Sequence, residues 1–91
     1  MKRIAVASAV LDDPGACQKA FNDTLSGYSG IIRGRMGIPF EKEKISVVSV
    51  VLAGELDEIN ALTGKLGNIP RVTVKTAISG ELKDSVGMSH K

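Results

Sequence analysis

The sequence predicts an α+β fold of the ferredoxin-like βαββαβ type, a four-stranded antiparallel sheet with two helices on one face. Four runs of apolar or alternating residues have the length of strands, and two segments have the 3.6-residue spacing of amphipathic helices. Their order along the chain is β-α-β-β-α-β. With 91 residues, 43% hydrophobic and 24% charged, the chain has the size and composition of one small globular domain.

The first strand is predicted over residues 3–11, which are apolar or small at nearly every position. The break Asp12-Asp13-Pro14-Gly15 then starts a helix, which ends near Gly27. Asp13 is expected to cap this helix, and Pro14 suits its first turn because that position needs no N–H donor. One face of the helix repeats with the period of an amphipathic helix: Cys17, Ala20, Phe21, Thr24, Leu25 and Tyr28.

A hairpin is predicted from residues 31–40 and 45–53. The first run alternates, with Ile32, Gly34, Met36, Ile38 and Phe40 on one face, and Pro39 near its end fits an edge strand. The charged turn 41–44 links it to the second run, which is rich in β-branched residues.

The second helix is predicted over residues 55–67 and the last strand over residues 71–78. Gly64 lies inside this helix, where glycine costs about 1 kcal/mol relative to alanine. We expect tight packing of the helix on the sheet to be the reason, and close approach of another backbone is the alternative. The domain is expected to span residues 1–79, followed by a flexible C-terminal tail over residues 80–91.

The sheet is predicted to be apolar on both faces. In the third strand, Val48, Val50 and Leu52 oppose an equally apolar set, whereas a sheet with one wet face should alternate. Because the helices cover one face only, the second face would be a large exposed apolar patch. We expect a homo-oligomer, by default a closed dimer, that covers this face, and the alternative is a tail that folds back over it.

Several chemistries are excluded by the residue types. One cysteine and one histidine provide neither a disulfide, nor a tetrahedral zinc site, nor a Ser-His-Asp or Cys-His constellation. No cofactor, metal site or enzymatic activity is therefore expected, and Cys17 is assigned to the core. A net charge of +2 with 3% aromatic residues argues against direct nucleic-acid binding.

The expected location is cytoplasmic, because the first apolar run is too short for a signal peptide and a lone cysteine fits a reducing compartment. No run approaches the ~20 apolar residues needed to span a membrane. Arg33 and Arg35, two apart on one strand, either bind a carboxylate or phosphate or keep a solvated edge from pairing.

Two stretches carry a resemblance to a known family. They are Arg35-Met36-Gly37-Ile38-Pro39, and Ala61-Leu62-Thr63-Gly64-Lys65-Leu66-Gly67 followed by Val72-Thr73-Val74-Lys75-Thr76. Over residues 3–79 the chain resembles the small regulators of the iron-only hydrogenase system. These are ACT-like and are similar to the ligand-binding C-terminal domain of the nickel-responsive regulator. The His and Cys nickel ligands and the DNA-binding arm of that regulator are absent, which argues against nickel sensing and operator binding.

The resemblance implies a non-enzymatic, ACT-like homo-oligomer that binds a small anionic or amino-acid effector or a hydrogenase-related protein. A pure assembly module without a small ligand is the alternative. The residues expected to bind the ligand are Arg35, Gly37, Gly64, Lys65 and Gly67, with Asp13 and Gly15 next. The glycines would allow close backbone approach, and Arg35 and Lys65 would attract an anion.

Overall fold

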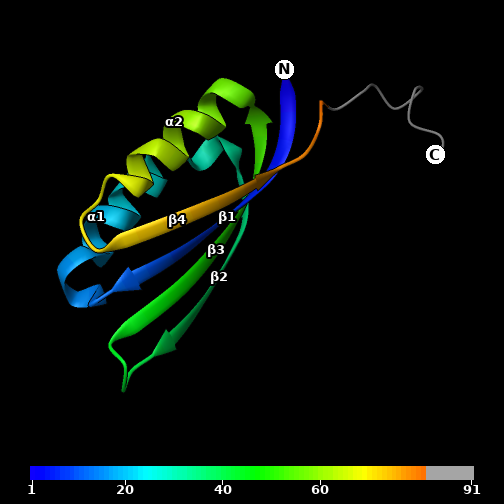
Figure 1. Ribbon diagram of the computed structural model, residues 1–91. Helices are drawn as coiled ribbons and strands as arrows, with labels where there is room; N and C mark the ends of the chain where they lie inside the picture. Colours follow the sequence, from blue (N-terminus) through cyan, green and yellow to red (C-terminus); the bar gives the residue numbers. More distant parts are fainter. Residues whose placement is uncertain (82–91) are drawn as a thin grey trace.

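The computed structural model describes residues 1–81 and confirms the ferredoxin-like fold (Figure 1). The elements are β1 Lys2–Asp12, α1 Pro14–Ser26, the short 3-10 helix η1 Ser29–Ile31, β2 Ile32–Phe40, β3 Ile45–Glu55, α2 Leu56–Gly67 and β4 Val72–Ile78. The strand order is β2-β3-β1-β4, and all neighbours are antiparallel. Most of the expected tail, residues 82–91, lies outside the described part. Neither helix within residues 1–81 is long and apolar enough to cross a membrane.

The core lies between the sheet and the two helices, which cover the same face (Figure 1). On β1 this face presents Ala5, Ala7 and Ala9, each 2% exposed. Their small side chains let the helices lie close to the sheet. The helices contribute buried residues at helical spacing: Cys17, Phe21 and Leu25 from α1, and Ile59, Leu62 and Leu66 from α2.

A β-bulge changes the predicted alternation of β2. Ile32 lies opposite Leu52, but Gly34 lies opposite Val51, so Arg33 has no partner position on β3. An unpaired extra residue moves the side chains before it to the other face of the sheet. The prediction that Ile32 shares a face with Gly34 was therefore wrong, because Ile32 lies on the helix side with Leu52.

The turn between β1 and α1 also differs from the prediction. Asp13 stands at the start of α1, but its side chain makes no capping hydrogen bond. Its backbone is left-handed (φ 60°), and its N–H donates to the carbonyl of Lys44. Lys44 and Arg71 also have positive φ, and the N–H of Asp12 donates to the carbonyl of Arg71. Backbone bonds to two other loops thus fix this turn, and they hold Asp13 away from a capping geometry.

The structure shows that packing requires glycine at one position, in β3, and does not require it at another, in α2. A Cβ on Gly54, in β3, would lie 2.6 Å from Cγ2 of Ile31 and 3.1 Å from its Cβ, so only glycine fits there. A Cβ on Gly64 would meet nothing within 4 Å. The expected tight packing of Gly64 on the sheet was therefore wrong, since the residue is exposed on α2.

We predict opposite effects of alanine at these two glycines. Gly54→Ala should lower the free energy of unfolding by about 1–3 kcal/mol, because the branched Ile31 cannot move away without disturbing η1. Gly64→Ala should raise it by about 0.5–1 kcal/mol through helix propensity. Urea unfolding of both variants measures this, and equal effects would contradict the packing described here.

Candidate functional site

Both helices lie on one side of the sheet, and we call the uncovered side the open face (Figure 1). Large apolar side chains on it are between 39% and 62% exposed. They are Ile4, Val6, Val10, Met36, Ile38, Phe40 and Val51. Strand register aligns them in rows, such as Val51 beside Val6, and Ile38 beside Val47 and Val10. The prediction of a second apolar sheet face is confirmed.

The open face has few polar residues, and they lie in its middle row and at its ends. Ser8 and Ser49 lie opposite each other in its middle row, with their Oγ atoms 3.3 Å apart. Lys75 continues this row on the edge strand β4. At the ends, register places Lys2 opposite Glu55 and puts Asp12 opposite Ile45. Two basic and two acidic residues thus border the face, and the N-terminal ammonium pairs with Glu55 at one of its ends.

Arg35 lies on the helix side of the edge strand β2, opposite Val50. Its Nη2 donates to Oδ1 of Asn22 on α1 at 2.6 Å. Both residues line a hollow of about 380 Å³ together with Leu25 and Ile32. Gly37 follows two positions later, and a Cβ there would make only ordinary contacts. The guanidinium is therefore anchored at a hollow that could admit a small anion.

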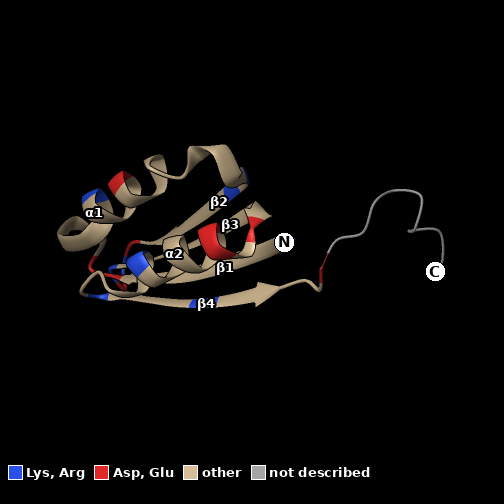
Figure 2. Cartoon of the chain, turned by 90° about the horizontal axis from the view of Figure 1, so that it is seen from above, with Lys and Arg blue, Asp and Glu red and all other residues tan. Residues whose placement is uncertain are grey.

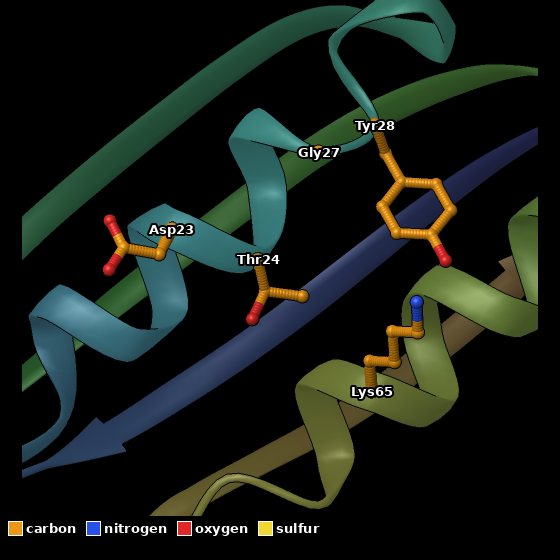
Figure 3. A pocket seen from close by; sticks show the side chains of 5 residues that line it. All are labelled: Asp23, Thr24, Gly27, Tyr28 and Lys65. Carbon is orange, nitrogen blue, oxygen red and sulfur yellow. The ribbon is translucent and has the colours of Figure 1, made fainter.

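Lys65 lies on α2 and faces α1. Its Nζ is 5.1 Å from the centre of the Tyr28 ring, a cation–π distance. Both residues line a hollow of about 550 Å³ between the two helices (Figure 3). Gly64 and Gly67 flank Lys65 in sequence, and a Cβ on either would meet nothing within 4 Å. The chain's own packing thus requires glycine at neither position.

Asp13 and Gly15 lie at a third place, where the start of α1 meets the β2–β3 hairpin. They line a hollow of about 350 Å³ with Phe40, Glu41 and Lys44. The seven predicted site residues are therefore divided among three regions. None of these three hollows is lined by both Arg35 and Lys65. The expectation that they attract one anion together has no support in this arrangement.

Sequence reasoning missed Asn22 and Tyr28 as site residues. Asn22 does not belong to the predicted apolar face of the first helix, and only the fold shows that β2 brings Arg35 to it. Tyr28 was placed on the apolar face of α1, but the helix ends at Ser26 and the residue is half-buried beyond it. The preceding Gly27 was the available signal, since glycine commonly marks a helix end.

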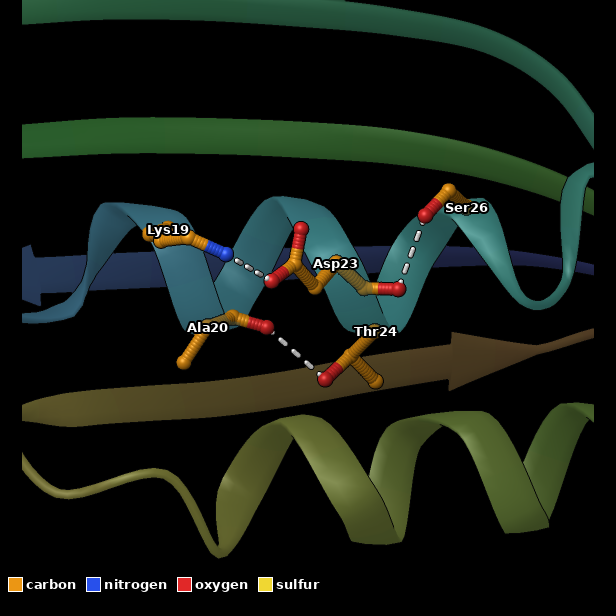
Figure 4. A network of polar contacts seen from close by, with 5 residues as sticks. All are labelled: Lys19, Ala20, Asp23, Thr24 and Ser26. Carbon is orange, nitrogen blue, oxygen red and sulfur yellow. Dashed lines mark hydrogen bonds and ion pairs between the residues drawn. The ribbon is translucent and has the colours of Figure 1, made fainter.

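Figure 4 shows polar contacts between residues of α1. Nζ of Lys19 lies 2.7 Å from Oδ2 of Asp23, an i,i+4 ion pair that raises the pKa of Lys19 mainly through the hydrogen bond. Oγ1 of Thr24 donates to the carbonyl of Ala20 at 2.8 Å. Both α-helices carry basic and acidic residues, so they form no basic face (Figure 2).

Cys17 is 2% exposed and packs in the core, as predicted. Its Sγ lies 3.8 Å from the carbonyl oxygen of Asp12 and 3.7 Å from that of Asp13. Burial, and then the negative charge of Asp13, raise the pKa of the thiol. Within residues 1–81, no three His, Cys, Asp or Glu residues are grouped to hold a metal ion.

Comparison with known proteins gives a family and a fold. The family model named TM1266-like, described as "Iron-only hydrogenase system regulator, putative", matches residues 3–76. The uncharacterized protein TM1266 from Thermotoga maritima is 35% identical with a TM-score of 0.82, and the match covers 86% of this chain and 98% of that one. No curated protein matches the chain.

Two more distant structures share the fold alone. An unknown protein from Galdieria sulphuraria is 14% identical with a TM-score of 0.60, over 92% of this chain and 49% of that one. SnoaB, a cofactor-independent oxygenase from Streptomyces nogalater, is 9% identical with a TM-score of 0.53, over 91% and 96%. At these identities, neither protein's activity bears on this chain.

We predict that Cys17 makes the stability depend on pH in the alkaline range. The thiol has a higher pKa in the folded than in the unfolded chain, so it stabilises the fold fully below the ordinary thiol pKa. This contribution is lost as the pH rises from that value through the raised one. Urea unfolding as a function of pH should show a decline that Cys17→Ala removes, and identical pH profiles would contradict this.

Proposed function

This chain belongs to the TM1266-like family of iron-only hydrogenase system regulators, and we propose that it works as a homo-oligomeric, ACT-like regulatory module. In this proposal it catalyses no reaction. Its subunits meet through the open face, and the helix side remains available for a small effector or a hydrogenase-related protein. The exposed apolar side chains of the open face carry the proposal.

The size of the open face supports a subunit interface. Seven large apolar side chains on it are between 39% and 62% exposed, and each partner of a stable complex buries ~800 Å² of surface. Soluble monomers rarely expose apolar patches larger than a few hundred Å². Burying such a surface is the main favourable term in association.

A second copy of the same chain is the partner that best fits this face. In a two-fold interface both subunits contribute the same surface. An excess of one charge on that surface would therefore be repelled by the same charge on the partner. Residues of both signs border the face, and Glu55 pairs with the N-terminal ammonium, so the repulsion between like charges is limited. The Ser8–Ser49 pair, already hydrogen-bonded, can be buried with its polar atoms partly satisfied.

Effector binding is the second part of the proposal. Arg35 supports it, because a guanidinium held by Asn22 beside a hollow is pre-organised to bind a carboxylate. A pure assembly module, the alternative, would use the open face alone. The two differ in their thermal behaviour: an effector raises the melting temperature, whereas assembly alone makes it depend on protein concentration.

We predict that Ile38→Glu converts the oligomer to a monomer. The residue is 50% exposed on the open face, and a carboxylate there would be buried without a partner in the interface. Light scattering coupled to size-exclusion chromatography measures the mass. Asn60→Glu, on the exposed surface of α2, is the control and should keep the wild-type mass. An unchanged mass for Ile38→Glu would remove the open face as the interface.

We predict that an effector is found among amino acids and nucleotides by thermal shift, and that Arg35→Ala weakens its effect. A ligand at ~100 times its dissociation constant adds about 2.7 kcal/mol, which is several degrees for a domain of this size. Arg33→Ala is the matched control, because that guanidinium donates to the chain's own Gly30 carbonyl. Equal shifts in the two variants would exclude Arg35 from the site.

A further inference from the structure

The hollow between α1 and α2 is lined by groups from both helices and from the turn that follows α1. Its lining residues are Asp23, Thr24, Gly27, Tyr28 and Lys65. Its volume of about 550 Å³ is in the range of small-molecule sites. Figure 3 shows the Lys65 amine and the Tyr28 hydroxyl directed toward each other across the gap between the helices.

The other polar groups of this hollow already have partners. The carboxylate of Asp23 pairs with Lys19, and the hydroxyl of Thr24 donates to the carbonyl of Ala20 (Figure 4). In contrast, Lys65 pairs with no carboxylate of residues 1–81, and the Tyr28 hydroxyl has no hydrogen-bond partner there. An ammonium and a phenol hydroxyl therefore stand at the hollow as uncommitted donors.

The two donors favour a carboxylate over a phosphate. A carboxylate has two oxygens, one for the ion pair with Lys65 and one for the hydrogen bond from Tyr28. A dianionic phosphate needs more donors, and α1 and α2 both end near this hollow. The C-terminal ends of helices carry partial negative charge, which opposes a doubly charged anion more than a singly charged one.

We propose that this hollow binds the carboxylate of a small organic acid between Lys65 and Tyr28. The inference goes beyond the proposed function, whose effector site is the hollow beside Arg35, and adds a second ligand site with a stated chemical class. The site lies on the helix side of the sheet, so an oligomer formed through the open face leaves it accessible. Lys65 is held over the Tyr28 ring in the absence of ligand, which reduces the entropy lost on binding.

The test is a titration of the full-length ¹⁵N-labelled protein with sodium acetate, followed by amide chemical shifts. Sodium chloride at equal ionic strength is the control for screening, and inorganic phosphate is the competing anion. The variants are Tyr28→Phe, which removes only the hydroxyl, and Lys65→Met, which keeps the apolar stem. Lys42→Met, in the hairpin turn, is the matched control for loss of one positive charge.

We expect acetate to shift the amides of Gly27, Tyr28 and Lys65 saturably in the wild type and in Lys42→Met. Tyr28→Phe and Lys65→Met should each weaken binding about tenfold or more, as expected for hydrogen bonds to a charged group. Their spectra also report whether each variant is folded. No saturable shift, equal affinity in all variants, or tighter binding of phosphate would overturn the proposal.

The design separates this inference from the interface proposal. Ile38→Glu, the monomeric variant, should bind acetate as the wild type does, because the open face lies on the other side of the sheet. A monomeric wild type that binds acetate would contradict the interface and keep the site. An oligomer that does not bind acetate would contradict the site and keep the interface.

Discussion

A layer of two helices covers one face of a four-stranded sheet, and in this chain both faces of the sheet are apolar. The two faces therefore differ in how much of their apolar surface is removed from water within one chain. One face is buried within the chain against α1 and α2, with 0% exposure at Leu52 and 1% at Leu11 and Val50. On the other, Met36 remains 62% exposed and Ile38 50%. The rest of the structure follows from this inequality, because the helix side stabilises the fold and the open face retains apolar surface for association.

The helix side also positions the ligand-binding candidates. Alanines on β1 let α1 and α2 lie close to the sheet, and the sheet holds the helices side by side. The end of α1 then brings Tyr28 to Lys65 on α2, while β2 brings Arg35 to Asn22 on the other side of α1. One helix thus separates two hollows, each with a cation that a different element supplies.

The order and type of the four strands and the two α-helices follow from the sequence, because apolar periodicity directly reflects which side chains are buried. The short 3-10 helix η1 was not predicted. The apolar character of the open face follows for the same reason, from Val47 and Val51 alternating with Val48 and Val50. Backbone geometry was harder to predict. The bulge at Arg33 and the left-handed turn at Asp13 depend on hydrogen bonds to residues far along the chain, such as Lys44. Likewise, Gly54 is required by Ile31, which lies 23 positions earlier.

The candidate site was predicted less well, since its residues come together only through packing. The resemblance pointed to Arg35 and Lys65, and the fold places them at separate hollows beside partners that the pattern did not indicate. Tyr28 is the clearest case: helical spacing placed it on the apolar face of the first helix, and its side chain does pack against the core. Its hydroxyl also reaches the gap between the helices, because α1 ends at Ser26, before Tyr28 is reached (Figure 3).

The proposed function depends on the interface through the open face, and sedimentation equilibrium of the wild-type protein measures this association without any substitution. We expect a mass at least twice the 9.6 kDa of one chain, falling toward that value only on strong dilution. A mass of 9.6 kDa at every concentration would show that the open face remains exposed to water and forms no interface.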